Sequence, residues 1–171
     1  LQCRGNFPDQ IMRILYAGIH SKAAGWGKLM GGVSDGRFKM TDKKTMEFYG
    51  TLSLENNGGF SSIRARMEEL ETTDYAAFKI RLKGDGKNYQ FRVRSQLNER
   101  HSYQYEFPTT GEWQEVTVPF DQMIPTFRGM RLNLPNYPGE VLRECSFLIS
   151  NKKNERFRLE IDKIWLETSS L

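Results

Sequence analysis

The sequence has few of the residues that disulfide bonds, metal sites or most catalytic centres require. Its two cysteines are Cys3 and Cys145, and its two histidines are His20 and His101. Two isolated cysteines form no disulfide framework, and the spacing of these four residues fits no zinc or other transition-metal site. We therefore expect two free thiols and no cofactor. The sequence leaves a bound calcium ion open, because calcium sites in loops follow no fixed spacing.

Long apolar runs and blocks of like charge are also missing. Hydrophobic residues make up 38% of the 171 residues, and 25 Lys and Arg against 21 Asp and Glu give a net charge of +4. These values predict a soluble domain that does not span a membrane, has no nucleic-acid partner and slightly favours anionic ligands. The chain does not begin with Met, so the sequence leaves its localisation open.

What the chain does contain is a series of strand-like runs separated by turn residues. These runs cover residues 45–54, 60–67, 76–83, 89–97, 102–107, 113–118, 145–150 and 157–166. Strands that follow one another without helical patterns between them predict an all-β fold, here a jelly-roll β-sandwich in a single domain of residues 1–171. Asp9 is a suitable N-cap for apolar residues at helical spacing, which predicts a short N-terminal helix, followed by a loop, within residues 1–25.

Turn residues and apolar phases give more specific expectations. Asn and Gly at 56–59 and at 84–86 tolerate positive φ, and Asp85-Gly86 predicts a hairpin between its flanking strands. The segment 120–139, with three prolines, is expected to cross one end of the sandwich as a loop. The residues expected in the core are Trp113, Phe147, Phe157 and Ile161.

One serine motif has the pattern of a hydrolase nucleophile. Gly32-Val33-Ser34-Asp35-Gly36 matches G-x-S-x-G, which needs a strand before the serine, a helix after it and a histidine further along the chain. Here glycine precedes the motif, a strand-like run follows it, and His101 lies in a polar turn. The sequence therefore favours a plain Gly-rich loop and a protein that is not an enzyme.

The most suggestive pattern is a set of polar residues in the same phase on successive strands. Guanidinium and amide groups on one sheet face suit planar recognition of carboxylates, phosphates or sugar hydroxyls. The alternative is a solvated face whose arginines pair internally with Glu106, Glu160 and Asp162. The expected partner-binding residues are Arg64, Arg66, Arg81, Arg92, Arg94 and Gln104, with Gln90 in the same phase.

Several motifs resemble, in order, the complex I intermediate-associated protein family, a family of 30-kilodalton assembly factors. They span about residues 26–166 and comprise Met30 to Ser34, Gly50 to Arg64, Gly84 to Lys87 with Tyr89, Trp113 to Phe120, Phe127 to Gly129, and Phe157 to Asp162. The resemblance is to bacterial members. It implies a galactose-binding-like jelly roll, similar to some carbohydrate-binding modules, and no established catalytic centre. One departure is Gly27-Lys28-Leu29, where the family usually carries an Asn-Asp pair, so a cation site at that pair is in doubt.

Two classes of function follow. The mitochondrial members of the family are chaperones in assembling respiratory complex I, which implies a non-catalytic, chaperone-like interaction module with a protein client, respiratory-complex subunits among the candidates. The alternative is a carbohydrate-binding module of jelly-roll type with a glycan partner, which predicts exposed aromatic side chains on a sheet face or in a cleft. Trp26, Tyr49 and Tyr137 are the aromatic residues that the sequence does not assign to the core.

Overall fold

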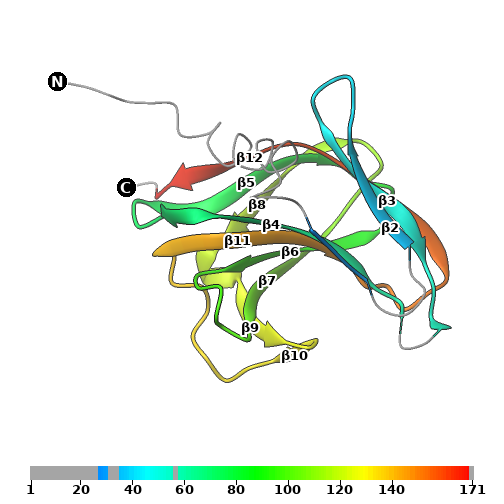
Figure 1. Ribbon diagram of the computed structural model, residues 1–171. Helices are drawn as coiled ribbons and strands as arrows, with labels where there is room; N and C mark the ends of the chain where they lie inside the picture. The colour runs from blue at the N-terminus through cyan, green and yellow to red at the C-terminus, as the bar shows by residue number, and fades with distance from the viewer. Residues whose placement is uncertain (1–26, 31–34, 56–57, 170–171) are drawn as a thin grey trace.

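Alternating apolar and polar residues build two antiparallel sheets that face each other across the core (Figure 1). The computed structural model describes residues 27–30, 35–55 and 58–169. Sheet A has the strand order β1-β4-β11-β6-β7-β9-β10, and sheet B has the order β2-β3-β12-β5-β8. This arrangement confirms the all-β jelly-roll sandwich. The expected N-terminal helix, Cys3 and most of the serine motif lie outside the described residues.

The strands differ greatly in length. Those of sheet A are β1 (Gly27–Met30), β4 (Ser61–Glu71), β11 (Val141–Ile149), β6 (Asn88–Arg94), β7 (Ser102–Pro108), β9 (Ile124–Phe127) and β10 (Met130–Arg131). Those of sheet B are β2 (Asp35–Met40), β3 (Met46–Leu52), β12 (Glu155–Thr168), β5 (Tyr75–Lys83) and β8 (Trp113–Pro119). The 3-10 helix η2 (Phe120–Gln122) follows β8.

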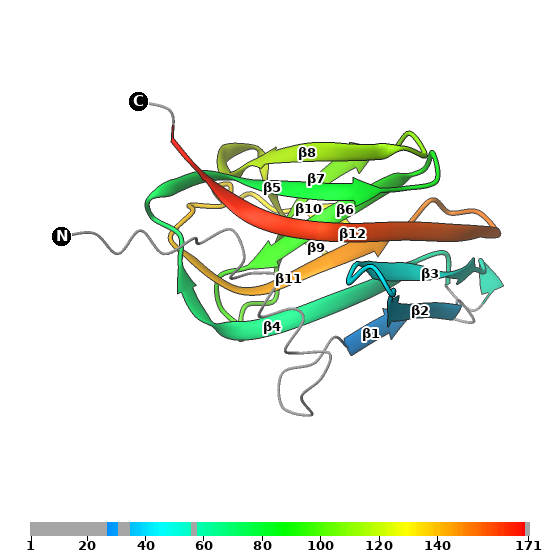
Figure 2. The ribbon, with the colours of Figure 1, turned by 90° about the horizontal axis from the view of Figure 1, so that it is seen from above.

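The predicted hairpin at Asp85-Gly86 is wrong, because β5 belongs to sheet B and β6 to sheet A. The loop between them crosses from one sheet to the other (Figure 2). Gly86 still has a positive φ of 83°, and its N–H donates to Thr109 Oγ1 at 3.1 Å. Thr109 Oγ1 donates in turn to the Lys87 carbonyl at 2.7 Å. A sheet crossing therefore uses the same turn residues as a hairpin would.

The core between the sheets is rich in aromatic rings. Phe147, Phe157 and Ile161 are buried as expected, and the Phe157 ring packs edge-on against Phe48 at 4.8 Å. Trp113 is wrong as a core residue, since it is 37% exposed. It lies in phase with the exposed side of β8, an edge strand, and its ring lies 5.2 Å from the Arg81 guanidinium.

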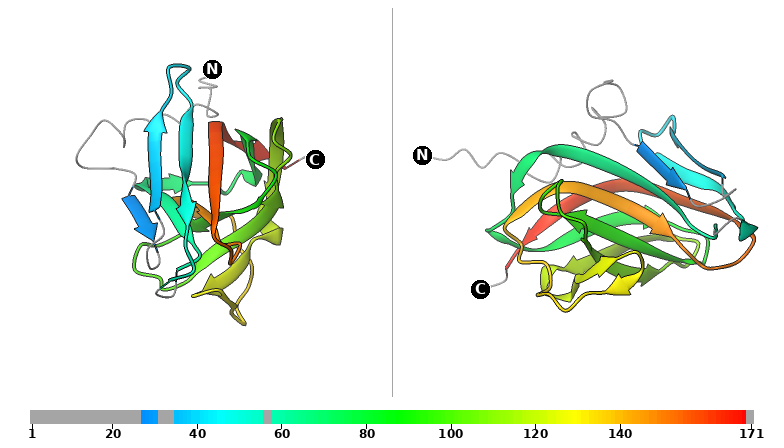
Figure 3. Two further views of the ribbon diagram at one scale, coloured as in Figure 1. Left: turned by 90° about the vertical axis from the view of Figure 1, so that its right-hand side faces the viewer. Right: turned by 60° about the horizontal axis from the view of Figure 1, so that its bottom comes forward.

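The segment 120–139 is more structured than expected. It contains η2 and the β9–β10 hairpin, which extends the edge of sheet A beyond β7 (Figure 3). Pro125 lies on β9 opposite Tyr103. Tyr137, left unassigned by the sequence, is 3% exposed and packs in the core. Cys145 is a free, buried thiol.

Candidate functional site

Five of the six predicted binding residues share the outer face of sheet A. In the antiparallel register, Arg92 lies opposite Gln104 on one side and Ser146 on the other, and Ser146 lies opposite Arg64. The apolar neighbours of these residues point into the core, so their own side chains point outward. The expected common face is therefore confirmed for the residues on β4, β6 and β7, namely Arg64, Arg66, Arg92, Arg94 and Gln104.

Arg81 is not part of this face. It lies on β5 in sheet B, and its Nε is 3.3 Å from Asp162 Oδ2 on β12. Alternation gave its phase correctly, but the two sheets have opposite outer faces, and a phase does not say to which sheet a strand belongs. The prediction that Arg81 shares a face with the other arginines is wrong.

Arg66 and Arg94 are joined by a carboxylate that the sequence analysis did not identify. Glu144 on β11 lies between them, with Oε2 at 2.9 Å from Arg66 Nε and Oε1 at 3.9 Å from Arg94 Nε. Its side chain is 7% exposed. The internal pairing considered for this face therefore exists, but through Glu144. Glu144 lies in the polar phase of β11 together with Ser146, and this phase was the available signal. It was missed because the predicted strand started one residue later, at Cys145.

Of the three acids considered as partners of the arginines, one pairs with an arginine as considered, and two accept from neutral groups. Asp162 pairs with Arg81, Glu160 Oε1 accepts from the Thr45 hydroxyl at 2.6 Å, and Glu106 Oε2 accepts from Gln90 Nε2 at 3.2 Å.

Arg92 has amide partners instead of a carboxylate. Its Nε and Nη2 donate to Gln90 Oε1 at 3.1 and 2.7 Å, and Nη2 also donates to Gln104 Oε1 at 3.0 Å. Thr126 Oγ1 donates to the same Gln104 oxygen at 3.2 Å. Burial lowers the pKa of the Arg92 guanidinium. Among the described residues no carboxylate lies within ion-pair distance of it, so its charge is partly desolvated and not neutralised.

Of the five predicted residues on this face, Arg92, Arg94 and Gln104 line a groove of about 740 Å³, whereas Arg64 and Arg66 do not. The β9–β10 hairpin and the ends of β7 and β11 complete it. Its lining carries five cationic side chains, several amides and hydroxyls, four apolar side chains, and, among the described residues, no Asp or Glu. The cations are Arg92, Arg94, Arg100, Arg128 and Lys152, and the apolar residues are Phe60, Phe127, Met130 and Leu148.

Two of the groove cations have a strained backbone. Arg128 has φ 49° and Lys152 has φ 53°, both in the left-handed region that disfavours residues with a Cβ. Lys44, in the β2–β3 turn, is the third non-glycine residue with positive φ in the described part of the chain, and it lies outside the groove. Such strain is often found at functional sites.

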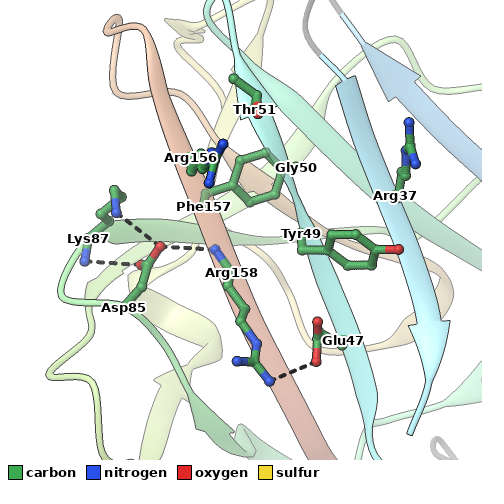
Figure 4. A pocket seen from close by; sticks show the side chains of 10 residues that line it. All are labelled: Arg37, Glu47, Tyr49, Gly50, Thr51, Asp85, Lys87, Arg156, Phe157 and Arg158. Atoms are coloured by element: carbon green, nitrogen blue, oxygen red, sulfur yellow. Dashed lines mark hydrogen bonds and ion pairs between the residues drawn. The ribbon is translucent and has the colours of Figure 1, made fainter.

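A second, shallower pocket lies on the outer face of sheet B (Figure 4). Its two carboxylates are already bound: Glu47 Oε2 accepts from Arg158 Nη2 at 2.9 Å, and Asp85 Oδ2 accepts from Lys87 Nζ at 3.1 Å. Asp85 Oδ2 also accepts from the Arg158 backbone N–H at 2.9 Å. Tyr49 is the only tyrosine in its lining. Internal pairing of this kind makes the pocket a weaker candidate than the groove.

The part of the chain that the structure describes has neither a metal-binding cluster nor a membrane-spanning helix. No three His, Cys, Asp or Glu side chains come together there to hold a metal ion. No helix there has the length and apolar character to cross a membrane.

Comparisons with known proteins give a family and a fold. No curated protein sequence matches the chain. The family 11 carbohydrate-binding module of the cellulase Lic26A-Cel5E of Clostridium thermocellum is similar in structure, with TM-score 0.68 and 14% identity over 84% of this chain and 88% of the module. The Clostridium thermocellum module in complex with a β-1,3-1,4-mixed-linked tetrasaccharide gives TM-score 0.64 and 15% identity over 84% and 89%. A family 30 carbohydrate-binding module has a TM-score of 0.53 and 12% sequence identity, over 84% of this chain and 95% of the module.

At such identities the structures share the fold alone. The sequence also shows the family, because the family described as "Complex I intermediate-associated protein 30 (CIA30)" matches residues 26–161. The chain belongs to the complex I intermediate-associated protein 30 family.

Proposed function

We propose that this chain is a non-catalytic, chaperone-like binding module that holds a protein client in the groove on sheet A. Family membership indicates a role related to complex I assembly, and assembly factors act on protein partners. The observation that carries the proposal is the charge of the groove, whose lining has five cations and no carboxylate among the described residues. A partly buried cation without a counter-charge binds an anionic group of a partner with less competition from water.

Carbohydrate binding is the second candidate. The similarity of fold to carbohydrate-binding modules favours it, as do the amides of Gln90 and Gln104, which suit sugar hydroxyls. The aromatic rings in the groove lining are Phe60 and Phe127. The Arg128 guanidinium lies 5.2 Å from the Phe127 ring, so this ring is no open platform for a sugar. The charge of the groove favours an anionic protein segment over a neutral glycan.

A pull-down from the native host, read beside a glycan array, tests the proposal. The wild-type chain is compared with Arg92→Gln/Arg128→Gly, which removes two groove cations. The matched control is Arg156→Gln/Lys44→Gly, which removes one Arg and one positive-φ cation outside the groove. We expect the wild type and the control to enrich respiratory-complex subunits, and the groove variant to lose them.

Two results would contradict the proposal. Equal enrichment of those subunits by the groove variant would place the binding surface elsewhere. Binding to glycans that is lost in the groove variant, without enrichment of any protein, would establish the carbohydrate-binding alternative.

A further inference from the structure

We propose that the segment held in the groove is an extended acidic peptide of the client, with carboxylates at Arg92 and at the rim cations Arg128 and Lys152. This inference rests on the proposed function and names the chemistry of the client. Three features of the groove support it: a pre-oriented guanidinium, two strained cations at the rim, and apolar surface beside both.

The guanidinium of Arg92 is fixed before any ligand arrives. Gln90 Oε1 accepts from both Nε and Nη2, and Gln104 Oε1 accepts from Nη2 while Thr126 holds that amide. These bonds leave Nη1 without a hydrogen bond among the described residues. A planar donor held in one orientation loses little entropy on binding, and carboxylates are its best-matched partners. The neutral amides orient the charge without cancelling it.

The rim cations lie at positions where a glycine would have less backbone strain. Arg128 and Gly129 have φ values of 49° and 79° and form the β9–β10 turn, in which Asn-Gly is the usual pair. Lys152, at φ 53°, lies in the connection between β11 and β12. A residue with a Cβ is strained in the left-handed region, whereas glycine is not. The backbone gains nothing from these side chains, whereas the groove gains two positive charges.

Apolar side chains accompany the cations. Phe60 and Leu148 line one part of the groove, Phe127 and Met130 line another, and Met130 is 64% exposed. An extended peptide alternates its side chains, so it can direct carboxylates to the cations and apolar groups to these four residues. A volume of about 740 Å³ suits a segment of a few residues. A single-stranded nucleic acid would need open aromatic rings for its bases, and Arg128 covers Phe127.

The test is a fluorescence-anisotropy titration of the purified chain with a short labelled peptide in which Glu alternates with Thr and Leu. The same peptide with Gln for Glu, a single-stranded oligonucleotide and polygalacturonate are the comparison probes. We expect the Glu peptide to bind best and to weaken with added salt. Arg92→Gln should weaken it about tenfold, and Arg128→Gly and Lys152→Gly, at exposed positions, about two- to fivefold each.

Lys44→Gly is the matched control, because it removes the same charge from the same backbone conformation outside the groove. It should leave the affinity unchanged. An equal loss in this variant would reveal non-specific charge attraction and overturn the inference. Tighter binding of the Gln peptide, the oligonucleotide or the polysaccharide would overturn it too. If the peptide fails while groove variants still lose client subunits in the pull-down, the acidic chemistry is wrong and the proposed function stands.

Discussion

Glu144 is the residue on which the charge balance of sheet A depends. It is buried and lies between Arg66 and Arg94, which would otherwise repel each other across β11. The arginines on this face are of two kinds, according to whether they contact this carboxylate. Arg66 and Arg94 have an acidic partner, while Arg92 has amides only.

Glu144→Gln should therefore lower the free energy of unfolding by about 1 to 3 kcal/mol, since it leaves two guanidinium groups without their counter-charge. Arg66 is 54% exposed, which keeps the loss below that of a fully buried pair. Urea denaturation at neutral pH measures the change. Glu106→Gln, at an exposed position on β7, is the control and should cost less than about 0.5 kcal/mol. Equal effects in the two variants would show that Glu144 has no special structural role.

Tyr137 makes stability sensitive to alkaline pH. Its hydroxyl donates to the Val141 carbonyl at 2.9 Å, and burial raises the pKa of Tyr137 to about 12 from 10.0. The folded state thus favours the neutral phenol. The resulting stability is complete below the unfolded-state pKa of about 10 and is lost as the pH rises through the folded-state pKa.

Between about pH 9 and about pH 11, this linkage should remove about 1 kcal/mol of unfolding free energy. Tyr137→Phe has no proton to lose at this position. We expect it to be less stable at neutral pH, because it loses the hydrogen bond, but to have a shallower decline over the same pH range. Urea unfolding curves at a series of pH values measure both slopes. Parallel declines for the two proteins would refute the role of Tyr137.

At the scale of elements, the connection before β11 depends on a close approach between backbone and ring. Gly139 has φ 72°, and a Cβ there would lie 2.5 Å from Phe120 Cδ2. Gly111 has φ 85° but faces open space. Substitution by alanine costs about 1 kcal/mol at either site for the left-handed backbone, and overpacking adds about 1 to 3 kcal/mol at Gly139. Gly139→Ala should thus lower the urea midpoint more than Gly111→Ala, and a reversed order would contradict the steric explanation.

The sequence predicted which side of each strand is apolar but not how the strands are shared between the sheets. Alternation is local, so it gave the outward phase of Arg64, Arg92 and Gln104 correctly. The membership of β5 in sheet B depends on long-range pairing with β8 and β12, which no local pattern encodes. For the same reason Arg81 was assigned to the wrong face. Trp113 was misplaced because it lies in the exposed phase of β8, with Glu115 and Thr117, and not in the buried phase of Val116 and Val118.

The groove itself was beyond prediction from the sequence. The short β9–β10 hairpin that forms its rim lies in a proline-containing segment that was expected to be a loop. A two-residue strand such as β10 is too short for an alternation pattern. Arg128 and Lys152 could be read as ordinary turn residues until their φ values and their position beside Arg92 were known. Their relation to the groove is a property of the assembled fold.

At the scale of the whole molecule, the two outer faces differ in how their charges are balanced. On sheet B, Asp85, Glu47 and Asp162 each have a basic partner. In the sheet A groove, Arg94 pairs with Glu144, while the other four cations have no carboxylate partner among the described residues. Charges that are balanced internally stabilise the fold, whereas unbalanced ones lower stability through mutual repulsion and attract anionic partners. This asymmetry predicts that binding and stability are opposed in the groove.

The variant Arg128→Gly/Lys152→Gly tests that opposition. Glycine adopts positive φ without strain, and the change also removes repulsion among groove cations, while the greater freedom of glycine in the unfolded chain opposes both gains. We expect the free energy of unfolding to stay unchanged or to rise by up to about 1 kcal/mol, while affinity for the acidic peptide falls. Calorimetry and anisotropy on the same preparation measure the two quantities. A residue that serves recognition lowers the stability of the fold, whereas a structural residue raises it. A large loss of stability together with lost binding would therefore show that these cations are structural.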